Sequence, residues 1–279
     1  MKQCKTRDHM IDKETEYLEL GVFSEKHQLI LDKSKEVQVL IIGGGSGGGK
    51  SYMSSLLSVP IVARPNTRSV FIRKTTPQLE GPGGLIETAK SIYGIVEDKL
   101  PGRFTKKPNT AHFNNGSIID FKSLRSDMYL DSFRGYKYDY ISIDEATHHT
   151  QHSLETLVDR LHKSTNNSSH MVLTCTARNG HYLHNMIKGY YLDEEGYPID
   201  ERAGDIRYFY RHEGEYYWGD SRVGLANKLD VPEDWITSFS YVGLTIFDNP
   251  CLVKNNPGYL DFLLSLDDDS KSRLLYGRW

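Results

Sequence analysis

Short apolar runs alternate with amphipathic segments along most of this chain. The apolar runs have the length of β-strands, and the segments between them place apolar residues at the three- and four-residue spacing of helices. The first 20 residues are charged and weakly patterned, and we expect them to be helical. The expected strands are 37–42, 69–73, 111–113, 117–121, 138–143, 171–176 and 241–246, and the expected helices are 50–58, 85–96, 154–162 and 259–279. This alternation predicts an α/β fold with a mainly parallel central sheet flanked by helices.

Two breaks in the alternation predict how the chain is organised. Asn114-Asn115-Gly116 separates two expected strands and is typical of a hairpin turn. Residues 190–230 contain many tyrosines, mixed charges and Gly-Asp turns, and we interpret them as an inserted hairpin or flap, a small subdomain beside the core. We therefore expect a core over 1–190, an insert over 191–240, and a last core strand with a helical tail over 241–279.

Composition narrows the class of protein. The chain has 279 residues, 38% hydrophobic and 25% charged, as in an ordinary globular protein. Its net charge of −3 means that any contact with nucleic acid must come from a local patch. Three widely spaced cysteines predict neither a disulfide framework nor a zinc cluster. No apolar run approaches the ~18 residues of a membrane span, and the polar N-terminus carries no secretory signal, so we expect no membrane contact.

The strongest motif follows the apolar run 39–42. Residues 43–51 read Gly-Gly-Gly-Ser-Gly-Gly-Gly-Lys-Ser and match the P-loop pattern through Gly44, Gly49, Lys50 and Ser51. A flexible linker is the alternative, but a linker needs neither the preceding strand nor the following helix. We predict that Lys50 reaches the β- and γ-phosphates of a nucleotide and that Ser51 holds Mg²⁺. The predicted nucleotide-binding loop is Gly44, Gly45, Ser46, Gly47, Gly48, Gly49, Lys50 and Ser51.

A second motif places two carboxylates at the end of an apolar strand. Asp144 and Glu145 directly follow Tyr140-Ile141-Ser142-Ile143. In a P-loop enzyme the strand-end aspartate holds Mg²⁺, and the adjacent glutamate can activate the attacking water. The alternative is an acidic pair that suits the dipole of the following helix. Together with the P-loop, the pair predicts hydrolysis of ATP with Mg²⁺, with Glu145 as the base.

These motifs together resemble the ATPase domain of the terminase large subunit of tailed double-stranded-DNA bacteriophages. Residues 23–28, ending in Gln28, resemble the segment that reads adenine in that family. Residues 43–51 and 143–146 match its phosphate and magnesium motifs, and Arg134-Gly135 resembles its Arg-Gly element. The family's domain ending is similar to Asp248-Asn249-Pro250, Tyr259 and residues 275–279. The resemblance covers nearly the whole chain.

The resemblance implies a DNA-packaging motor, in which ATP hydrolysis moves viral double-stranded DNA into a procapsid. It implies that Arg134 reaches the active site of a neighbouring subunit, with Arg73 and Arg178 as rival candidates. Thr174 and Thr176 resemble the coupling motif, but the Asn-Pro that often follows in the family is missing here. The loop also lacks the arginine that many members carry, so the charge near the γ-phosphate must come from elsewhere.

The implied partners are double-stranded DNA, the portal protein of the procapsid and the small terminase subunit. The implied assembly is a homo-oligomeric ring in the host cytoplasm, although an isolated domain could be a monomer. The family's nuclease domain is not expected within these residues. A helicase-like ATPase, a small-molecule kinase and a nucleotide-gated assembly module remain alternatives.

Four further patterns are weaker. Residues 227–230 match the guanine-reading motif of GTPases without the required strand, and His148 and His152 have a zinc-compatible spacing without the protease pattern. The aromatic residues of 208–218 are interpreted as hairpin packing rather than as a stacking surface for bases. The acidic run 267–269 is interpreted as a solvated helix start.

Overall fold

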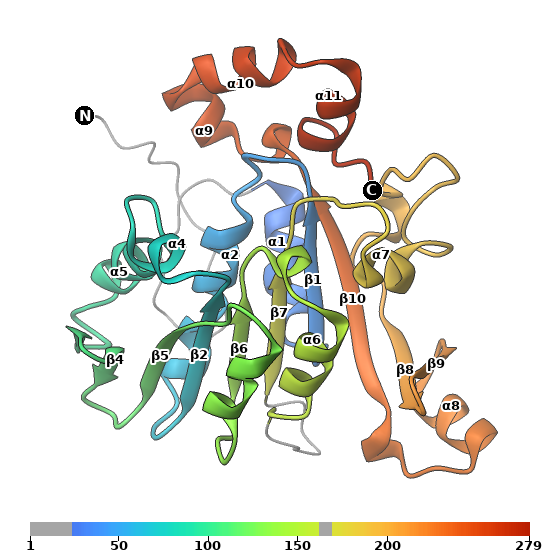
Figure 1. The fold of residues 1–279 in the computed structure, drawn as a ribbon, viewed down its shortest axis with the longest axis horizontal. Coiled ribbons are helices and arrows are strands. Elements are labelled where there is room, and N and C mark those ends of the chain that lie inside the picture. Colours follow the sequence, from blue (N-terminus) through green and yellow to red (C-terminus); the bar gives the residue numbers. More distant parts are fainter. Residues whose placement is uncertain (1–23, 162–168) are drawn as a thin grey trace.

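One ten-stranded sheet runs through the part of the protein that the structure describes. The computed structural model describes residues 24–161 and 169–279, so the helix predicted within residues 1–20 lies outside the described residues. The strand order is β3-β4-β5-β2-β6-β7-β1-β10-β8-β9, and the sheet is seen nearly face-on in Figure 1.

The centre of the sheet is parallel, as predicted. The six central strands pair in parallel from β5 to β10. In sheet order they are β5 (Ile118–Ser123), β2 (Arg68–Arg73), β6 (Tyr140–Ile143), β7 (His170–Thr174), β1 (Val39–Gly44) and β10 (Thr237–Leu244). Because the strands are parallel, the P-loop after β1 and the acidic pair after β6 leave the sheet at the same edge. This confirms the predicted α/β class with a mainly parallel sheet.

Antiparallel hairpins complete both sides of the sheet. β3 (Gly102–Lys106) and β4 (Asn109–Phe113) extend it beyond β5, and Gly116 turns β4 into β5 with φ 86°. On the other side β8 (Arg207–His212) pairs with β10, and β9 (Glu215–Gly219) pairs with β8. The predicted insert therefore contains a hairpin that continues the main sheet.

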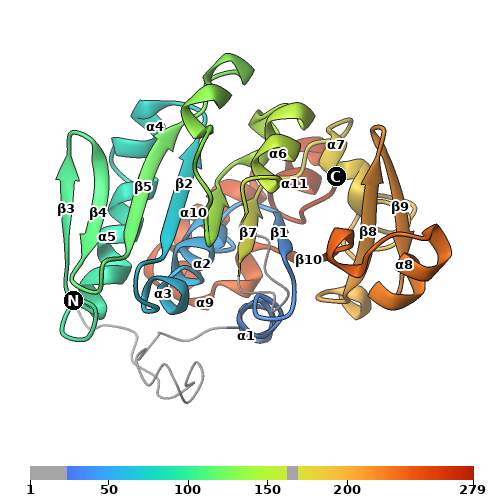
Figure 2. The same cartoon turned by 90° about the horizontal axis from the view of Figure 1, so that it is seen from below.

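Helices cover both faces of the sheet. Leu40 and Ile42 of β1 pack in one hydrophobic core, and the alternate residues Val39 and Ile41 pack in the other. α1 and α2 lie on one side and α6 on the other (Figure 2). The α-helices are α1 (Glu25–Lys33), α2 (Lys50–Leu56), α3 (Val59–Val62), α4 (Thr76–Glu80), α5 (Leu85–Ile95), α6 (Gln151–Val158), α7 (Tyr182–Ile187) and α8 (Arg222–Leu229). The 3₁₀ segments are η1 (Asp127–Phe133), η2 (Ala146–His148), η3 (Asp200–Arg202), η4 (Glu233–Trp235) and η5 (Ile246–Asp248).

The C-terminal helices lie beyond the end of the sheet where β1 finishes (Figure 1). Three short helices lie here: α9 (Pro250–Asn255), α10 (Pro257–Leu264) and α11 (Asp268–Leu274). The single helical tail predicted over 259–279 is wrong, because the chain is not helical between Leu264 and Asp268. Two of them begin at a proline, which is tolerated only in the first turn of a helix. α11 begins after Asp267, whose carboxylate accepts a hydrogen bond from the Ser270 amide at 2.9 Å, so the acidic run does start a helix.

The other element boundaries differ from expectation by a few residues. β10 begins at Thr237 rather than at 241, and α6 begins at Gln151 because the Thr150 hydroxyl caps it. That helix ends at Val158 with Asp159 as its C-cap, so the predicted extension beyond 158 is wrong. Among the helices that are described, none is both long and apolar enough to cross a membrane.

Candidate active site

The P-loop takes a backbone path that requires glycine. Gly44, Gly47 and Gly49 have φ values of 111°, 79° and 83°, which side chains with a Cβ rarely adopt. A Cβ on Gly44 would lie 2.2 Å from the Leu244 carbonyl oxygen of β10. The glycines therefore allow the loop to pass close to β10 before α2 begins at Lys50.

Other segments hold the loop from outside. His27 Nε2 of α1 donates to the Gly48 carbonyl at 2.8 Å, and Asn249 Nδ2 donates to the Gly47 carbonyl at 2.8 Å. Burial lowers the pKa of His27, although its bond to Gly48 and the nearby Asp248 oppose the shift. A neutral imidazole with its proton on Nε2 suits this contact.

Two loop amides are already engaged by the C-terminal half of the chain. The Gly45 amide donates to the Leu244 carbonyl at 2.8 Å, and the Ser46 amide donates to the Leu274 carbonyl at 2.6 Å. These two members of the predicted nucleotide-binding loop are thus occupied in this conformation. The amides that follow, from Gly47 to the start of α2, are the ones that a phosphate would use.

A cavity of about 280 Å³ opens over the loop. Its walls include Tyr52, Glu145, Thr176 and Tyr259 besides the residues of 46–51. The cavity therefore brings together the P-loop, Glu145 of the acidic pair, and Thr176, one of the two threonines proposed for coupling.

Asp144 connects the two motifs. Ser51 Oγ donates to Asp144 Oδ1 at 2.8 Å across 93 residues of sequence, and Thr174 Oγ1 donates to the same oxygen. Arg73, the last residue of β2, donates from Nε to Asp144 Oδ2 at 2.6 Å. The carboxylate is only 1% exposed, so these donors replace the water that it would otherwise bind.

Lys50 is the buried cation of the loop. It is 8% exposed, and its ammonium donates to the Gly45 carbonyl. Burial lowers the pKa of Lys50, while Glu145, Cys175 and Asp144 act in the opposite direction. A lysine in this position is ready to exchange a carbonyl for a phosphate oxygen.

Glu145 has an uncommon backbone conformation. Its φ of 54° and ψ of 51° lie in the left-handed region, and it precedes η2. Its amide donates to Thr174 Oγ1 at 3.4 Å, so one hydroxyl contacts both members of the acidic pair. Left-handed backbone on residues other than glycine clusters at active sites, although Asn66, Glu213 and Asp230 of this chain adopt it elsewhere.

The oxygen atoms of Ser51 and Asp144 are suitable ligands for a magnesium ion. Mg²⁺ prefers hard oxygen ligands and usually keeps several waters, so one or two protein ligands suffice. The Ser51 hydroxyl and the Asp144 carboxylate lie within 2.8 Å of each other. Within residues 24–161 and 169–279, no cluster of three or more His, Cys, Asp or Glu side chains is placed to hold a metal.

Arg134 lies away from this cavity. It follows η1, its side chain is 74% exposed, and its Nε pairs with Asp131 at 2.9 Å. Two residues later, the ring of Tyr136 lies against the guanidinium of Arg68. Arg68 is the first residue of β2 and Arg73 the last, so the two arginines lie at opposite ends of that strand. The rival Arg178 donates to the Thr147 carbonyl at 3.0 Å, beside η2.

Gln28 lies next to the loop-binding His27 on α1. Its Nε2 donates to Asp32 at 3.2 Å, while its Oε1 is buried and has no hydrogen-bond partner among the described residues. Phe23, the start of the segment compared with the adenine-reading element, lies outside the described residues. The role of Gln28 stays a prediction.

The weaker patterns take ordinary structural positions. Residues 227–230 close α8 rather than a strand, so the guanine-reading motif lacks its context. The predicted packing role of the aromatic hairpin agrees with the ring centroids of Phe209 and Trp218, which lie 5.3 Å apart, with both rings against Phe239.

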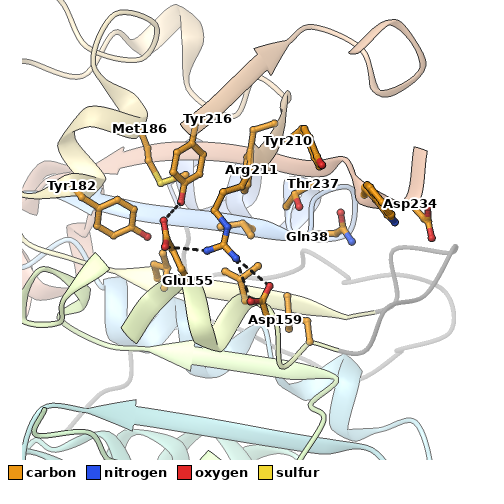
Figure 3. Close-up of a pocket in the computed structure, with 16 residues that line it drawn as sticks. Gln38, Glu155, Asp159, Tyr182, Met186, Tyr210, Arg211, Tyr216, Asp234 and Thr237 are labelled. Carbon is orange, nitrogen blue, oxygen red and sulfur yellow. Dashed lines mark hydrogen bonds and ion pairs between the residues drawn. The ribbon is translucent and has the colours of Figure 1, made fainter. Parts of the chain in front are cut away.

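A second pocket of about 230 Å³ lies between α6, α7 and the β8–β9 hairpin (Figure 3). Arg211 Nη1 pairs with Glu155 at 3.1 Å and its Nη2 pairs with Asp159 at 3.2 Å, while the Tyr216 hydroxyl donates to Glu155 at 2.8 Å. These contacts attach the hairpin to α6, the helix that follows the acidic pair.

Some residues at the site carry no recognisable signal in the sequence. His27 and Tyr52 are brought to the site by the fold. Arg73 and Asp144 were both named from the sequence, but their pairing was not. Asn249 and Tyr259 belong to the predicted domain ending, but their contacts with the loop could not be read from it.

Solved structures with the same fold include phage terminases. A large terminase from a thermophilic bacteriophage superposes with a TM-score of 0.61 at 14% identity, over 92% of this chain and 54% of that one. The same terminase in complex with ADP gives a TM-score of 0.60 at 14% identity, with coverage of 92% and 54%. The large terminase ATPase domain of Thermus phage P74-26 gives 0.55 at 13% identity, over 92% of this chain and 94% of that one. No curated protein matches the sequence. The chain thus spans about half the length of the thermophilic phage terminase.

The sequence model of one protein family covers most of the chain. It is described as terminase large subunit, T4likevirus-type, N-terminal, and it matches residues 41–279. The matched range contains the P-loop, the acidic pair and the C-terminal helices, which confirms the predicted resemblance. The chain therefore belongs to the T4likevirus-type terminase large subunit family, in its N-terminal region.

Proposed function

We propose that this chain is an ATPase motor domain that hydrolyses ATP to move double-stranded viral DNA into a procapsid. The observation that carries the proposal is the 2.8 Å contact between Ser51 and Asp144, which joins the P-loop to the strand-end acid. Glu145 follows directly and lines the same cavity. The phosphate cradle, Ser51 and the candidate base line one cavity, and Asp144 contacts Ser51 from behind it. These are the parts that ATP hydrolysis requires.

The residues have distinct roles in this proposal. The amides at the start of α2 and the Lys50 ammonium bind the phosphates, and Gln28 contacts the adenine. Ser51 and Asp144 hold Mg²⁺, which when bound neutralises the phosphate charge. Glu145 takes the proton of the attacking water. Thr174, which contacts Asp144 and the Glu145 amide, and Thr176, which lines the cavity, couple hydrolysis to movement.

The proposed assembly is a homo-oligomeric ring on the portal protein of a procapsid, with the small terminase subunit as a further partner, in the host cytoplasm. Support comes from the family to which the chain belongs and from the exposed position of Arg134. An arginine this exposed, paired with the equally exposed Asp131 outside its own cavity, is in a position to act on a neighbouring subunit.

ATPase activity measured against protein concentration, with and without duplex DNA, tests this function. We expect specific activity to rise with concentration and with duplex DNA, because active sites shared between subunits form only on assembly. A helicase would separate the strands of a labelled duplex, and a kinase would transfer phosphate to an acceptor. Either of these results, or no ATP hydrolysis at any concentration, would refute the proposal.

The role of Arg134 predicts rescue by mixing. Arg134→Ala and Glu145→Gln subunits should each be inactive, whereas a mixture should regain part of the wild-type activity. In the mixture, an Arg134→Ala subunit keeps its Glu145 and can receive Arg134 from a neighbouring Glu145→Gln subunit. Such arginines contribute about 10³–10⁵ in rate in other enzymes. ATPase assays over a range of mixing ratios measure the rescue, and no recovery at any ratio would argue that Arg134 does not act in trans.

A further inference from the structure

The Asp144 carboxylate accepts contacts from four protein donor atoms, and a metal ion bound to it would have to displace some of them. Ser51 and Thr174 donate to Oδ1, and the Arg73 guanidinium contacts Oδ2 through Nε and Nη2. The third nitrogen of Arg73, Nη1, donates to the Gln78 carbonyl at 3.0 Å. The guanidinium is thus anchored on both sides, with its side chain 18% exposed.

A buried carboxylate needs a cation close by. Lys50 contributes to the charge balance, but its ammonium donates to the Gly45 carbonyl. Arg73 is the cation in direct contact with Asp144. The register of the sheet sets this contact. β2 and β6 are neighbouring strands in which Ile72 pairs with Ile143, so the next residues, Arg73 and Asp144, lie side by side.

A divalent cation at Asp144 would compete with this ion pair. The metal needs lone pairs of the same carboxylate, and the charge of the guanidinium opposes a second cation a few ångströms away. The competition is strongest for the metal alone, since no phosphate is present to add negative charge.

We propose that Arg73 is the counter-ion of Asp144 in the nucleotide-free protein, and that its guanidinium leaves the carboxylate when metal binds. The inference rests on the proposed function, because it takes Asp144 as the magnesium ligand. Its consequence is that the site rejects free divalent metal and accepts it together with nucleotide, whose phosphates compensate the added charge.

Titration of the whole chain with Mn²⁺ alone, followed by the electron paramagnetic resonance of free Mn²⁺, tests the proposal. The wild-type protein should bind Mn²⁺ weakly, and Arg73→Gln should bind it about tenfold more tightly or better, since one opposing charge is removed. Adding Asp144→Asn to Arg73→Gln should abolish the gain.

Arg68→Gln is the matched control. Arg68 lies at the other end of β2 and also pairs with a carboxylate, through Nη2 to Asp120 Oδ2 at 3.0 Å. Its loss removes an arginine–aspartate pair from the same strand without touching Asp144, so Mn²⁺ affinity should stay at the wild-type value.

Thermal unfolding provides a second measurement. Without metal, Arg73→Gln should unfold at a lower temperature than wild type, and Mn²⁺ should stabilise it more than it stabilises wild type. If Arg73→Gln does not fold, Arg73→Lys keeps a positive charge but loses the two-pronged contact, and it should show a smaller gain in Mn²⁺ affinity of the same sign.

Equal Mn²⁺ affinity in wild type and in the folded Arg73 variant would overturn the proposal, as would a gain that survives Asp144→Asn. Wild-type ATP turnover, measured on the same preparations, separates this failure from failure of the proposed function. If the wild type turns over ATP but the Arg73 variant binds Mn²⁺ no more tightly than the wild type, only the role of Arg73 is rejected. Absent turnover would reject the function.

Discussion

Glu145→Gln is expected to bind ATP with nearly wild-type affinity and to lose turnover by a factor of about 10²–10⁴. The substitution keeps the size of the side chain but removes the carboxylate that accepts the proton of water. The phosphate cradle and the Ser51–Asp144 pair are untouched, so binding should persist. Phosphate release measures turnover, and titration with a fluorescent ATP analogue measures affinity.

Glu194→Gln is the control for this experiment. Glu194 is an exposed glutamate outside the cavity, and its substitution should change neither quantity. If Glu145→Gln retained wild-type turnover, the base would have to be another group. The left-handed backbone of Glu145 would then need a different explanation.

Lys50→Met is expected to weaken ATP binding by about 10- to 150-fold, the effect of losing a hydrogen bond from a charged donor of about 1.5–3 kcal/mol. Methionine is unbranched and of similar length, so it fills the same space without the charge. Isothermal titration with Mg²⁺ and ATP measures the loss, and turnover at subsaturating ATP should fall in parallel.

The same substitution should raise stability without nucleotide. Burial lowers the pKa of Lys50, which means that the surroundings disfavour its charged form despite the nearby carboxylates. Replacing the buried ammonium with an apolar group removes that cost. The midpoint of thermal unfolding should rise by about 2–4 °C per kcal/mol gained in a protein of this size.

Lys228→Met is the matched control. Lys228 is exposed on α8 and belongs to the pattern that imitates a guanine-reading motif. Neither ATP affinity nor unfolding temperature should change in this variant. Lower stability of Lys50→Met would mean that its bond to the Gly45 carbonyl outweighs the burial of the charge.

Much of the fold could be predicted from local patterns. β1, β2, β6 and β7 lie close to the apolar runs that predicted them, because a buried parallel strand requires such a run. The helical tail predicted over 259–279 was less accurate, since the chain leaves the helix at 265–267, between α10 and α11, and α11 ends at Leu274. The insert was recognised by composition, but its pairing with β10 could not be, because pairing between distant strands leaves no local pattern.

The sequence by itself determined the glycine-rich loop with Lys50 and Ser51, and the acidic pair Asp144 and Glu145 at a strand end. Each is a local arrangement whose chemistry depends on neighbouring residues. Only the tertiary structure decided which groups hold them: Arg73 on Asp144 across 71 residues, and Asn249 on Gly47 across 202. Such contacts follow from the order of parallel strands and the path of the C-terminal helices, because both depend on how the whole chain packs.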